Sequence, residues 1–335
     1  MKQHRVLVVG VGSIGERHLR CLQKTGRTEV GLCEINEDLR SRVAGTYGVG
    51  ASFPDLDRAL EQSWDAAVIA VPAHLHIPIA LRLAGAGVGL YIEKPLATSL
   101  AGLEDLQKQV REKGLPCAVA YVYRAHPVLR DMAQAIRQGL LGRLLQVVVV
   151  SGQDFAFYRP AYRQTYYTDR RTGGGAIQDA LTHLFNAAEW LAGPISRIAV
   201  DASHQRIPGV EVEDTVVAIA RHGRLLASYS LNQHQAPNET FLTVVGEQGT
   251  ARFELHNCCW RFADRPGTPW VDHCFGPMER DDWFIVQERL FLDMLEGRSE
   301  PLCSLDEGIQ TLKVNLAALE SVAKGGVPVD IGKIR

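Results

Sequence analysis

The sequence predicts an α/β domain with a doubly wound parallel sheet, followed by an α+β domain with a large open, mostly antiparallel sheet. The chain has 335 residues, more than one typical hydrophobic core accommodates. Strand and helix patterns alternate through residues 1–122, which is typical of a parallel sheet covered on both faces. Beyond residue 123, strands follow one another through hairpin-like links. We therefore expect two domains, at residues 1–122 and 123–335.

The elements of the first domain are delimited by runs of apolar residues and by glycine or proline. Strands are expected at residues 5–9, 29–33, 50–53, 66–71, 89–92 and 117–122. Helices are expected at residues 55–61, 75–84 and 99–113, and after the first strand, where Ile14, Leu19 and Leu22 share a helical spacing.

The second domain is richer in strands. These are expected at residues 144–151, 197–202, 215–221, 225–231, 241–245 and 251–254, with turns at 223–224 and 246–249. Helices are expected at 127–138, 176–191, 281–296 and 305–324, and a loop rich in Gly and Pro at 266–277.

The composition excludes several classes of protein. Hydrophobic content of 46%, charged content of 22% and a net charge of −2 are ordinary for a globular protein and give no basic surface for nucleic acid or membrane. No apolar run approaches the length of a membrane span, and the N-terminus leads directly into a strand, which leaves no room for a signal peptide. We therefore expect a cytoplasmic protein.

The seven cysteines include no C-x-x-C motif, and several fall inside predicted elements as small buried hydrophobes. His256, Cys258, Cys259, His273 and Cys274 form a cluster, but their spacing matches no closed zinc site, and strand alternation sends Cys258 and Cys259 to opposite faces. We expect no metal site.

The first strand runs directly into a G-x-G-x-x-G motif, residues 10–15, that contains Ser13 and Ile14. Gly10 permits the tight turn, Gly12 lets the backbone approach a pyrophosphate, and Gly15 lets the next helix pack closely on the sheet. The helix N-terminus then offers N–H groups to the phosphates. This arrangement predicts a dinucleotide-binding Rossmann domain.

An acidic residue, Glu34, follows the second strand. A carboxylate at this position accepts hydrogen bonds from a ribose 2′-OH and repels a 2′-phosphate, and the nearest following arginine, Arg40, lies a helical turn or more away. The cofactor is therefore expected to be NAD rather than NADP. The alternative is that Glu34 is only a solvated charge at a strand end.

A lysine stands where another strand of the sheet ends, in the run Glu93-Lys94-Pro95. Ligands of open α/β sheets bind beyond the carboxyl ends of the strands, and a desolvated lysine there polarises a substrate oxygen or moves its proton. The alternative is a surface salt bridge between Lys94 and Glu93. Whether the bond before Pro95 is cis is left open.

The helix that follows Gly173-Gly174-Gly175 carries Asp179 and His183 on the side opposite its apolar stripe. Residues four apart are neighbours on a helix, so the carboxylate can orient the imidazole and leave its other nitrogen as a base. The triple glycine allows close approach of a backbone or a ligand. The alternative is a solvated helix face with a local His–Asp pair.

A further signal is the run Val71-Pro72-Ala73-His74-Leu75-His76, which follows the strand at residues 66–71. Its backbone is placed to border a ribose or a nicotinamide. For either histidine, the alternative is a polar residue at a helix N-terminus.

Together these features resemble the glucose–fructose oxidoreductase/inositol dehydrogenase/MocA (Gfo/Idh/MocA) family over essentially the whole chain. The matching residues are Gly10, Gly12, Ser13, Ile14, Gly15, Glu34, Val71, Pro72, His76, Glu93, Lys94, Pro95, Gly173–Gly175, Asp179 and His183, with residues 291–302 and 305–331 resembling the family's final elements. The resemblance implies NAD(P)-dependent oxidation or reduction of a sugar, cyclitol or nucleotide-sugar hydroxyl. It implies that His183 accepts the proton, Asp179 assists it and Lys94 holds the reacting hydroxyl. It also implies a homodimer or homotetramer formed through the sheet of the second domain.

The resemblance further points to three substrate-binding residues, Arg124, Tyr162 and Tyr166, in a region rich in Tyr and Arg. Such side chains bind carboxylates or phosphates and stack on rings, but they also form dimer contacts. Two other functions stay open. Some proteins of this fold are NAD-dependent glycosidases, and a non-catalytic NAD or sugar sensor would keep the cofactor site without needing a proton relay.

Overall fold

The computed structural model describes residues 3–334 and divides the chain into two compact units. Unit 1 contains Met1–Ala125 and Glu279–Ile309, and unit 2 contains His126–Met278 and Gln310–Arg335. The division differs from the one expected at residue 122, because residues 279–309 pack with the first unit instead of the second. Within residues 3–334, no helix is both long and apolar enough to cross a bilayer.

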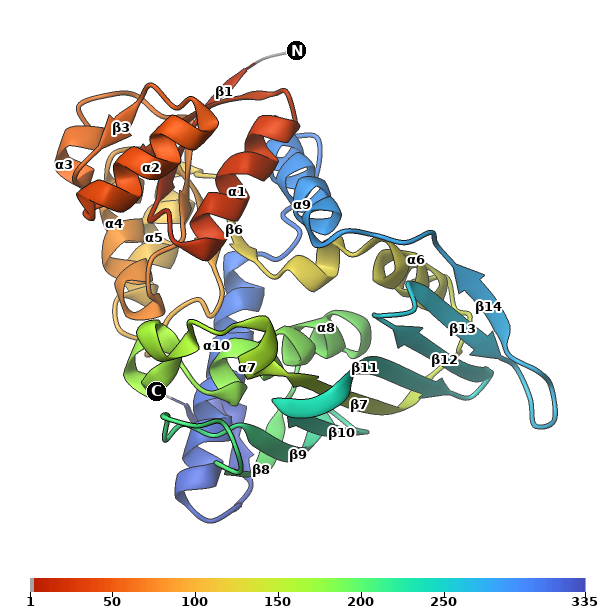
Figure 1. Cartoon of the computed structure of the whole chain (residues 1–335). Helices are drawn as coiled ribbons and strands as arrows, with labels where there is room; N and C mark the ends of the chain where they lie inside the picture. Colours follow the sequence, from red (N-terminus) through yellow and green to blue (C-terminus); the bar gives the residue numbers. More distant parts are fainter. Residues whose placement is uncertain (1–2, 335) are drawn as a thin grey trace. The chain divides into compact units, whose positions relative to one another are not determined.

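Unit 1 is built on a parallel six-stranded sheet in the order β3-β2-β1-β4-β5-β6 (Figure 1). Its strands are β1 (His4–Val9), β2 (Thr28–Cys33), β3 (Ser52–Phe53), β4 (Ala66–Ile69), β5 (Gly89–Glu93) and β6 (Cys117–Ala120). The order reverses between β1 and β4, the point at which doubly wound sheets bind their ligands. The predicted Rossmann fold is confirmed.

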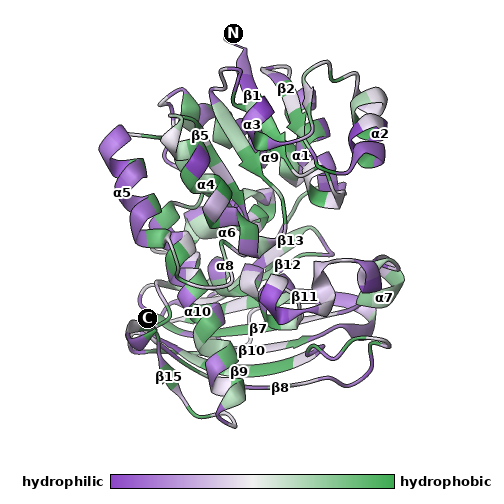
Figure 2. Cartoon of the chain, turned by 90° about the vertical axis from the view of Figure 1, so that its left-hand side faces the viewer, coloured by the Kyte–Doolittle hydropathy of each residue, from purple (hydrophilic) through white to green (hydrophobic). Residues whose placement is uncertain are grey.

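Helices cover both faces of this sheet, which explains the continuous apolar runs of its strands. On one face, α1 (Ser13–Lys24), α2 (Glu37–Tyr47) and α9 (Arg280–Leu295) share a core with alternate residues of β1, β2 and β4. On the other face, α4 (His76–Gly85) contacts β4 and β5 and packs against α5 (Leu103–Lys113), as Figure 2 shows. Helix α9, from far along the chain, thus completes the first core by packing beside α1.

Unit 2 is built on a nine-stranded sheet in the order β14-β13-β12-β11-β7-β10-β9-β8-β15. Its strands are β7 (Leu144–Asp154), β8 (Arg197–Ser203), β9 (Thr215–His222), β10 (Leu225–Asn232), β11 (His234–Gly246), β12 (Gly249–Glu254), β13 (Cys259–Ala263), β14 (Val271–Cys274) and β15 (Val329–Asp330). Among these described strands, β7 and β10 pair in parallel and the other neighbours pair antiparallel. The mostly antiparallel sheet predicted for the second domain is confirmed.

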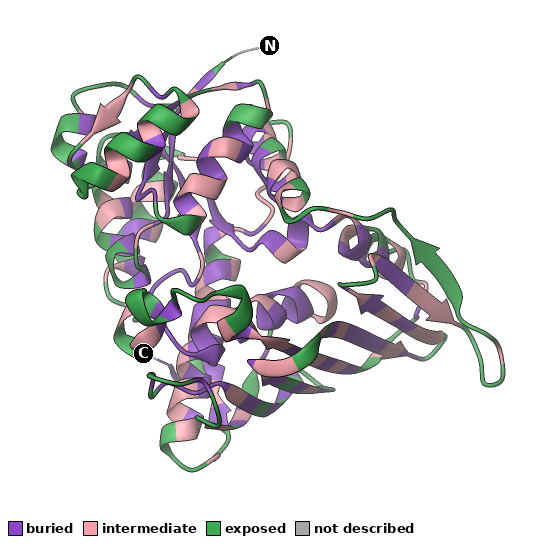
Figure 3. Cartoon of the chain, in the orientation of Figure 1, coloured by how far each residue is buried: buried purple, intermediate pink, exposed green. Residues whose placement is uncertain are grey.

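One face of this sheet carries helices, and the other is open. Helix α6 (Pro127–Arg137) contacts β12 and β13, and α8 (Thr182–Ala192) contacts β7. Buried and exposed residues alternate along β9 and β10, as Figure 3 shows for the sheet. The exposed positions include Val217, Ile219 and Leu226, so the open face is partly apolar.

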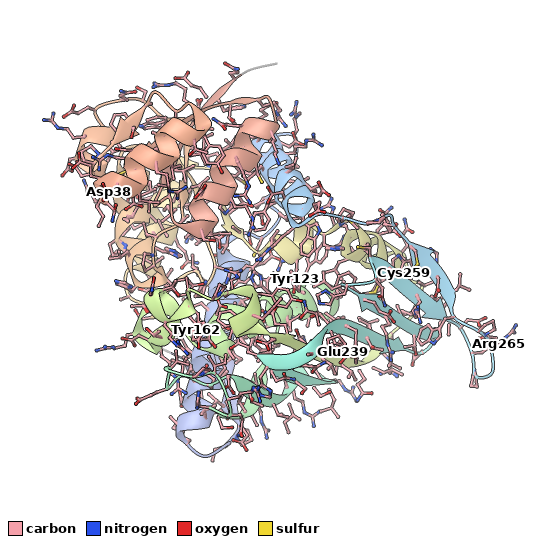
Figure 4. The ribbon with its side chains drawn as sticks, viewed as in Figure 1. Asp38, Tyr123, Tyr162, Glu239, Cys259 and Arg265 are labelled. Carbon is pink, nitrogen blue, oxygen red and sulfur yellow. A yellow bond between two sulfur atoms is a disulfide. The ribbon has the colours of Figure 1, made fainter. Side chains whose placement is uncertain are left out.

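The segment 266–277, expected to be a loop, contains the edge strand β14. Its residue Cys274 pairs across the ladder with Cys259 of β13, and the two form a disulfide. Figure 4 labels Cys259 on β13, and Arg265 between β13 and β14. The expectation was wrong because the Gly and Pro residues near 266–277 surround a strand too short to give a visible alternation. The spacing of the two cysteines gave no signal of their pairing.

Candidate functional site

The glycine motif connects β1 to α1 at the carboxyl edge of the sheet. Gly10 has a φ of +83°, which favours glycine, and a Cβ on Gly15 would collide with the carbonyl oxygen of Gly10. A Cβ on Gly12, by contrast, would meet no atom within 4 Å. Two of the three glycines are therefore required by the packing of the loop, whereas Gly12 borders open space that a ligand can occupy.

The start of α1 is suited to an anion. Gly12 and Ser13 are exposed, and Ile14 packs partly against the core below. Gly12 occupies the N-cap position without a side-chain cap on the first amides of the helix. Unsatisfied N–H groups and the positive end of the helix dipole are what a pyrophosphate requires. The loop therefore fits the phosphates of a dinucleotide.

Glu34 lies beside this loop, immediately after β2. The Val11 amide donates to its Oε2 at 3.0 Å, and the Asn36 amide donates to its Oε1 at 3.0 Å. These bonds hold the half-buried carboxylate next to the glycine motif, where a ribose hydroxyl would lie relative to bound phosphates. The guanidinium of Arg40 donates to the backbone carbonyl of Glu34 at 2.9 Å.

The loops that follow β4 and β5 are joined by His76. Val71 is half-buried and Pro72 is exposed, whereas His76 is only 1% exposed. The Nε2 of His76 lies 2.8 Å from the carbonyl of Val71, and its Nδ1 lies 3.1 Å from the carbonyl of Pro95. Burial lowers the pKa of His76. The buried imidazole thus joins the two loops, and its predicted contact with the cofactor stays a prediction.

Lys94 follows β5 at the carboxyl edge of the sheet and is half-buried, with a cis peptide bond to Pro95. The neighbouring Glu93 is 4% exposed, and its carboxylate faces His18 of α1. The Oε2 of Glu93 accepts the Lys94 amide at 2.9 Å. Because Glu93 is buried, the alternative of a surface pair does not hold. Its carboxylate supports the lysine loop, and its predicted contact with the cofactor stays a prediction.

Arg124, predicted to contact substrate, is 2% exposed. Its Nη1 donates to Glu307 at 2.5 Å and to the carbonyl of Leu302 at 3.1 Å. A guanidinium held in this way anchors the start of α10 (Leu305–Ala323) within unit 1. These bonds give Arg124 a structural role, and its predicted contact with substrate stays a prediction.

In unit 2 the triple glycine makes room for protein groups. A Cβ on Gly174 would collide with the backbone of Tyr167, and a Cβ on Gly175 would lie 2.5 Å from a carboxylate oxygen of Glu213. Glu213 is completely buried and accepts the Ile177 amide at 3.1 Å. The predicted close approach therefore occurs, and it fixes the start of the next helix.

That helix begins with a π-helical turn, Ile177–Leu181, and continues as α8. Asp179 lies in the π turn and His183 in the first turn of α8, and both are half-buried. π-helical turns are rare in proteins, and those that occur are often found at functional sites. The π turn at Asp179 therefore supports this segment as a candidate functional site. The alternative of a solvated helix face does not hold further along, since Asn186 is buried and donates to Thr311 of α10 at 3.0 Å.

The two candidate tyrosines have different surroundings. The Tyr166 hydroxyl donates to Oδ1 of Asp179 at 2.6 Å, and this tyrosine is 38% exposed. Tyr162, labelled in Figure 4, is 5% exposed, donates to the carbonyl of Pro208 and packs in a cluster with Phe155. Tyr162 is thus a core residue, and its predicted contact with substrate stays a prediction. Tyr166 stays a candidate because it touches the predicted catalytic carboxylate.

The structure also reveals polar residues that the sequence interpretation missed. His18 and Glu288 are fully buried in unit 1, and Glu213 is fully buried in unit 2. One signal was available: His18 stands on the buried stripe of α1 with Leu19 and Leu22, where an apolar residue is expected. The partners of these residues are distant in the sequence and gave no local signal.

Two family models match the chain. Residues 4–121 match the model described as "Oxidoreductase family, NAD-binding Rossmann fold", and residues 129–252 match the "GFO/IDH/MocA C-terminal domain". Among relatives, 1,5-anhydro-D-fructose reductase of Ensifer adhaerens is 24% identical over 334 residues, covering 95% of this chain and 96% of the relative. Levoglucosan dehydrogenase of Pseudarthrobacter phenanthrenivorans is 30% identical over 169 residues, covering 50% of this chain and 43% of the relative.

Solved structures have the same fold. A levoglucosan dehydrogenase in complex with NADH superposes with a TM-score of 0.89 at 22% identity, covering 98% of this chain and 99% of the other. The WlbA dehydrogenase from Bordetella pertussis, in complex with NADH and UDP-GlcNAcA, gives a TM-score of 0.82 at 25% identity, covering 98% and 99%. The chain therefore belongs to the Gfo/Idh/MocA family of NAD-binding oxidoreductases that act on CH–OH groups.

Proposed function

We propose that this protein is an NAD-dependent dehydrogenase or reductase of a hydroxyl on a sugar, a cyclitol or a nucleotide sugar. The observation that carries the proposal is the position of Lys94, at the carboxyl end of β5, with its amide held by a buried carboxylate. A family of CH–OH oxidoreductases and relatives named for anhydrofructose, levoglucosan and inositol support the substrate class.

In this proposal each residue has one task. Bound NAD supplies a nicotinamide that exchanges hydride with the carbon of the reacting hydroxyl. The ammonium of Lys94 binds the hydroxyl oxygen and stabilises the charge that develops on it. His183 accepts the hydroxyl proton, and Asp179 favours the resulting imidazolium. Tyr166, hydrogen-bonded to Asp179, orients that carboxylate.

The experiment that tests this function measures NADH formation on a panel of aldoses, inositols, anhydrosugars, uronates and nucleotide sugars, with reduction of the matching ketones followed as NADH loss. We expect turnover in at least one substrate class. Release of a free sugar without net NADH would instead identify a glycosidase. NAD binding by calorimetry with no turnover in either direction would identify a sensor.

The proposed ribose contact makes a separate prediction. Replacing Glu34 with alanine removes a carboxylate acceptor, so we expect about tenfold weaker NAD binding and a preference for NAD over NADP that falls by a similar factor. Calorimetric titration with both cofactors measures this. The control is Glu37→Ala, which removes an exposed carboxylate from the first turn of α2. An unchanged cofactor preference in Glu34→Ala would contradict the ribose contact.

We also propose that the open face of the unit 2 sheet joins copies of the chain into a homodimer or homotetramer. Val217, Ile219 and Leu226 are 55%, 63% and 51% exposed, and burial of such apolar positions favours association. Light scattering after gel filtration should give the mass of two or four chains, and Ile219→Lys should shift it toward one. A wild-type mass of one chain at micromolar concentration would contradict the proposal.

A further inference from the structure

A buried histidine of α1 lies between two carboxylates from distant parts of unit 1. His18 is completely buried; its Nδ1 lies 2.6 Å from Oε1 of Glu288 in α9, and its Nε2 lies 2.7 Å from Oε1 of Glu93 in β5. Glu288 is completely buried as well. Two aromatic rings also pack edge-on against the imidazole. The ring centroid of Tyr91 of β5 lies 5.8 Å away, and that of Phe284 of α9 lies 5.6 Å away.

The hydrogen-bonding pattern favours one protonation state of this histidine. An ionised carboxylate only accepts hydrogen bonds, and a neutral imidazole has one N–H to donate. Both short contacts of His18 are therefore satisfied together when the ring is an imidazolium. Burial by itself would lower the pKa of His18, but Glu288 and then Glu93 outweigh burial and raise it to about 10. Burial raises the pKa of Glu288, and it raises the pKa of Tyr91, which also faces the ring, well above the usual range.

The charge on His18 is connected to the lysine loop through one residue. Oε1 of Glu93 faces His18, and Oε2 of the same carboxylate accepts the Lys94 amide at 2.9 Å. The other side of the loop is held at Pro95 by His76, whose pKa burial lowers. The backbone of Lys94 is thus fixed by a carboxylate whose own orientation depends on His18.

We propose that His18, held as an imidazolium between Glu93 and Glu288, is a positioning residue that sets the location of Lys94 for the reaction. The inference rests on the proposed function of Lys94 and extends it. His18 neutralises a buried carboxylate that would otherwise be costly to keep ionised, and so keeps Glu93 directed at the Lys94 amide. It acts on the reaction through Lys94 and needs no contact with substrate.

The first test is the His18→Gln variant, whose amide can donate to one carboxylate but turns an oxygen toward the other. We expect kcat to fall by about 10–100-fold, the range typical of a misplaced reactive group, with KM and NAD affinity changed far less. The matched control is Leu22→Ala, which truncates a completely buried core side chain one turn further along α1. A kcat for His18→Gln equal to that of Leu22→Ala would overturn the proposal.

Two measurements by NMR test the network without activity. In protein labelled at histidine, the His18 ring should stay protonated throughout neutral pH, and Glu288→Gln should lower its pKa. In His18→Gln, the Lys94 amide proton, shifted downfield by its carboxylate acceptor, should move upfield. A His18 ring that titrates near the usual histidine pKa, or a Lys94 amide unaffected by His18→Gln, would overturn the inference.

These readouts separate the two ideas. If Lys94→Ala keeps full turnover, the proposed role of Lys94 fails, and the inference built on it fails with it, even if His18 is charged. If Lys94→Ala is inactive but His18→Gln behaves like Leu22→Ala, only the positioning role of His18 fails.

Discussion

Replacing His183 with alanine is expected to reduce kcat by about two to four orders of magnitude while NAD affinity stays nearly unchanged, because the variant loses its general base and keeps the cofactor loop. Steady-state turnover on the substrate identified by the panel, together with calorimetric titration of NAD, measures both effects. The expectation rests on the position of His183, directly after the π turn that carries Asp179.

A suitable control is His273→Ala, which removes an exposed histidine from the edge strand β14 of the same unit. That variant should keep wild-type turnover. Loss of less than tenfold in His183→Ala would show that another group accepts the proton, and Tyr166, which contacts Asp179, would then be the next candidate.

Replacing Lys94 with alanine is expected to have the second large effect on turnover. We expect kcat to fall by about 10²–10³-fold, the cost of removing one group that stabilises developing charge on an oxygen. Lys94→Arg should recover only part of this loss, because a planar guanidinium places its charge differently from an ammonium. Turnover under saturating NAD distinguishes this effect from weaker cofactor binding.

The control for this variant is Lys108→Ala, which removes an exposed lysine from α5 in the same unit. If Lys94→Ala raised only KM and left kcat intact, the lysine would serve binding alone, and the proposed stabilisation of the reacting oxygen would have to be abandoned.

Local sequence patterns predicted the features of unit 1 that depend on neighbours in the chain. The apolar strands, the turn at Gly10 and the tight approach at Gly15 follow from residue type and spacing, and each appears in the structure. The cofactor class followed from the same short stretch, together with Glu34.

Features that depend on distant partners could not be predicted in this way. The ion pair between Arg124 and Glu307 joins residues 183 positions apart, so no local pattern indicated it. Tyr162 and Tyr166 stand in the same Tyr-rich segment of the sequence. In the structure Tyr162 packs in a core, whereas the Tyr166 hydroxyl donates to Asp179. Tertiary packing decides which of two similar polar residues is buried. The periodicity of the sequence carries no information about such contacts between distant segments.

The discontinuity of unit 1 has a consequence for biosynthesis. A ribosome delivers all six strands of the first sheet well before it delivers α9, because the whole of Leu144–Cys274 is made in between. Until then, the face that Phe291 and Leu292 later cover stays open to chaperones or to premature association, and His18 lacks the carboxylate of Glu288. Release of α9 from the exit tunnel is therefore the event that completes both the first hydrophobic core and the charge network that supports Lys94.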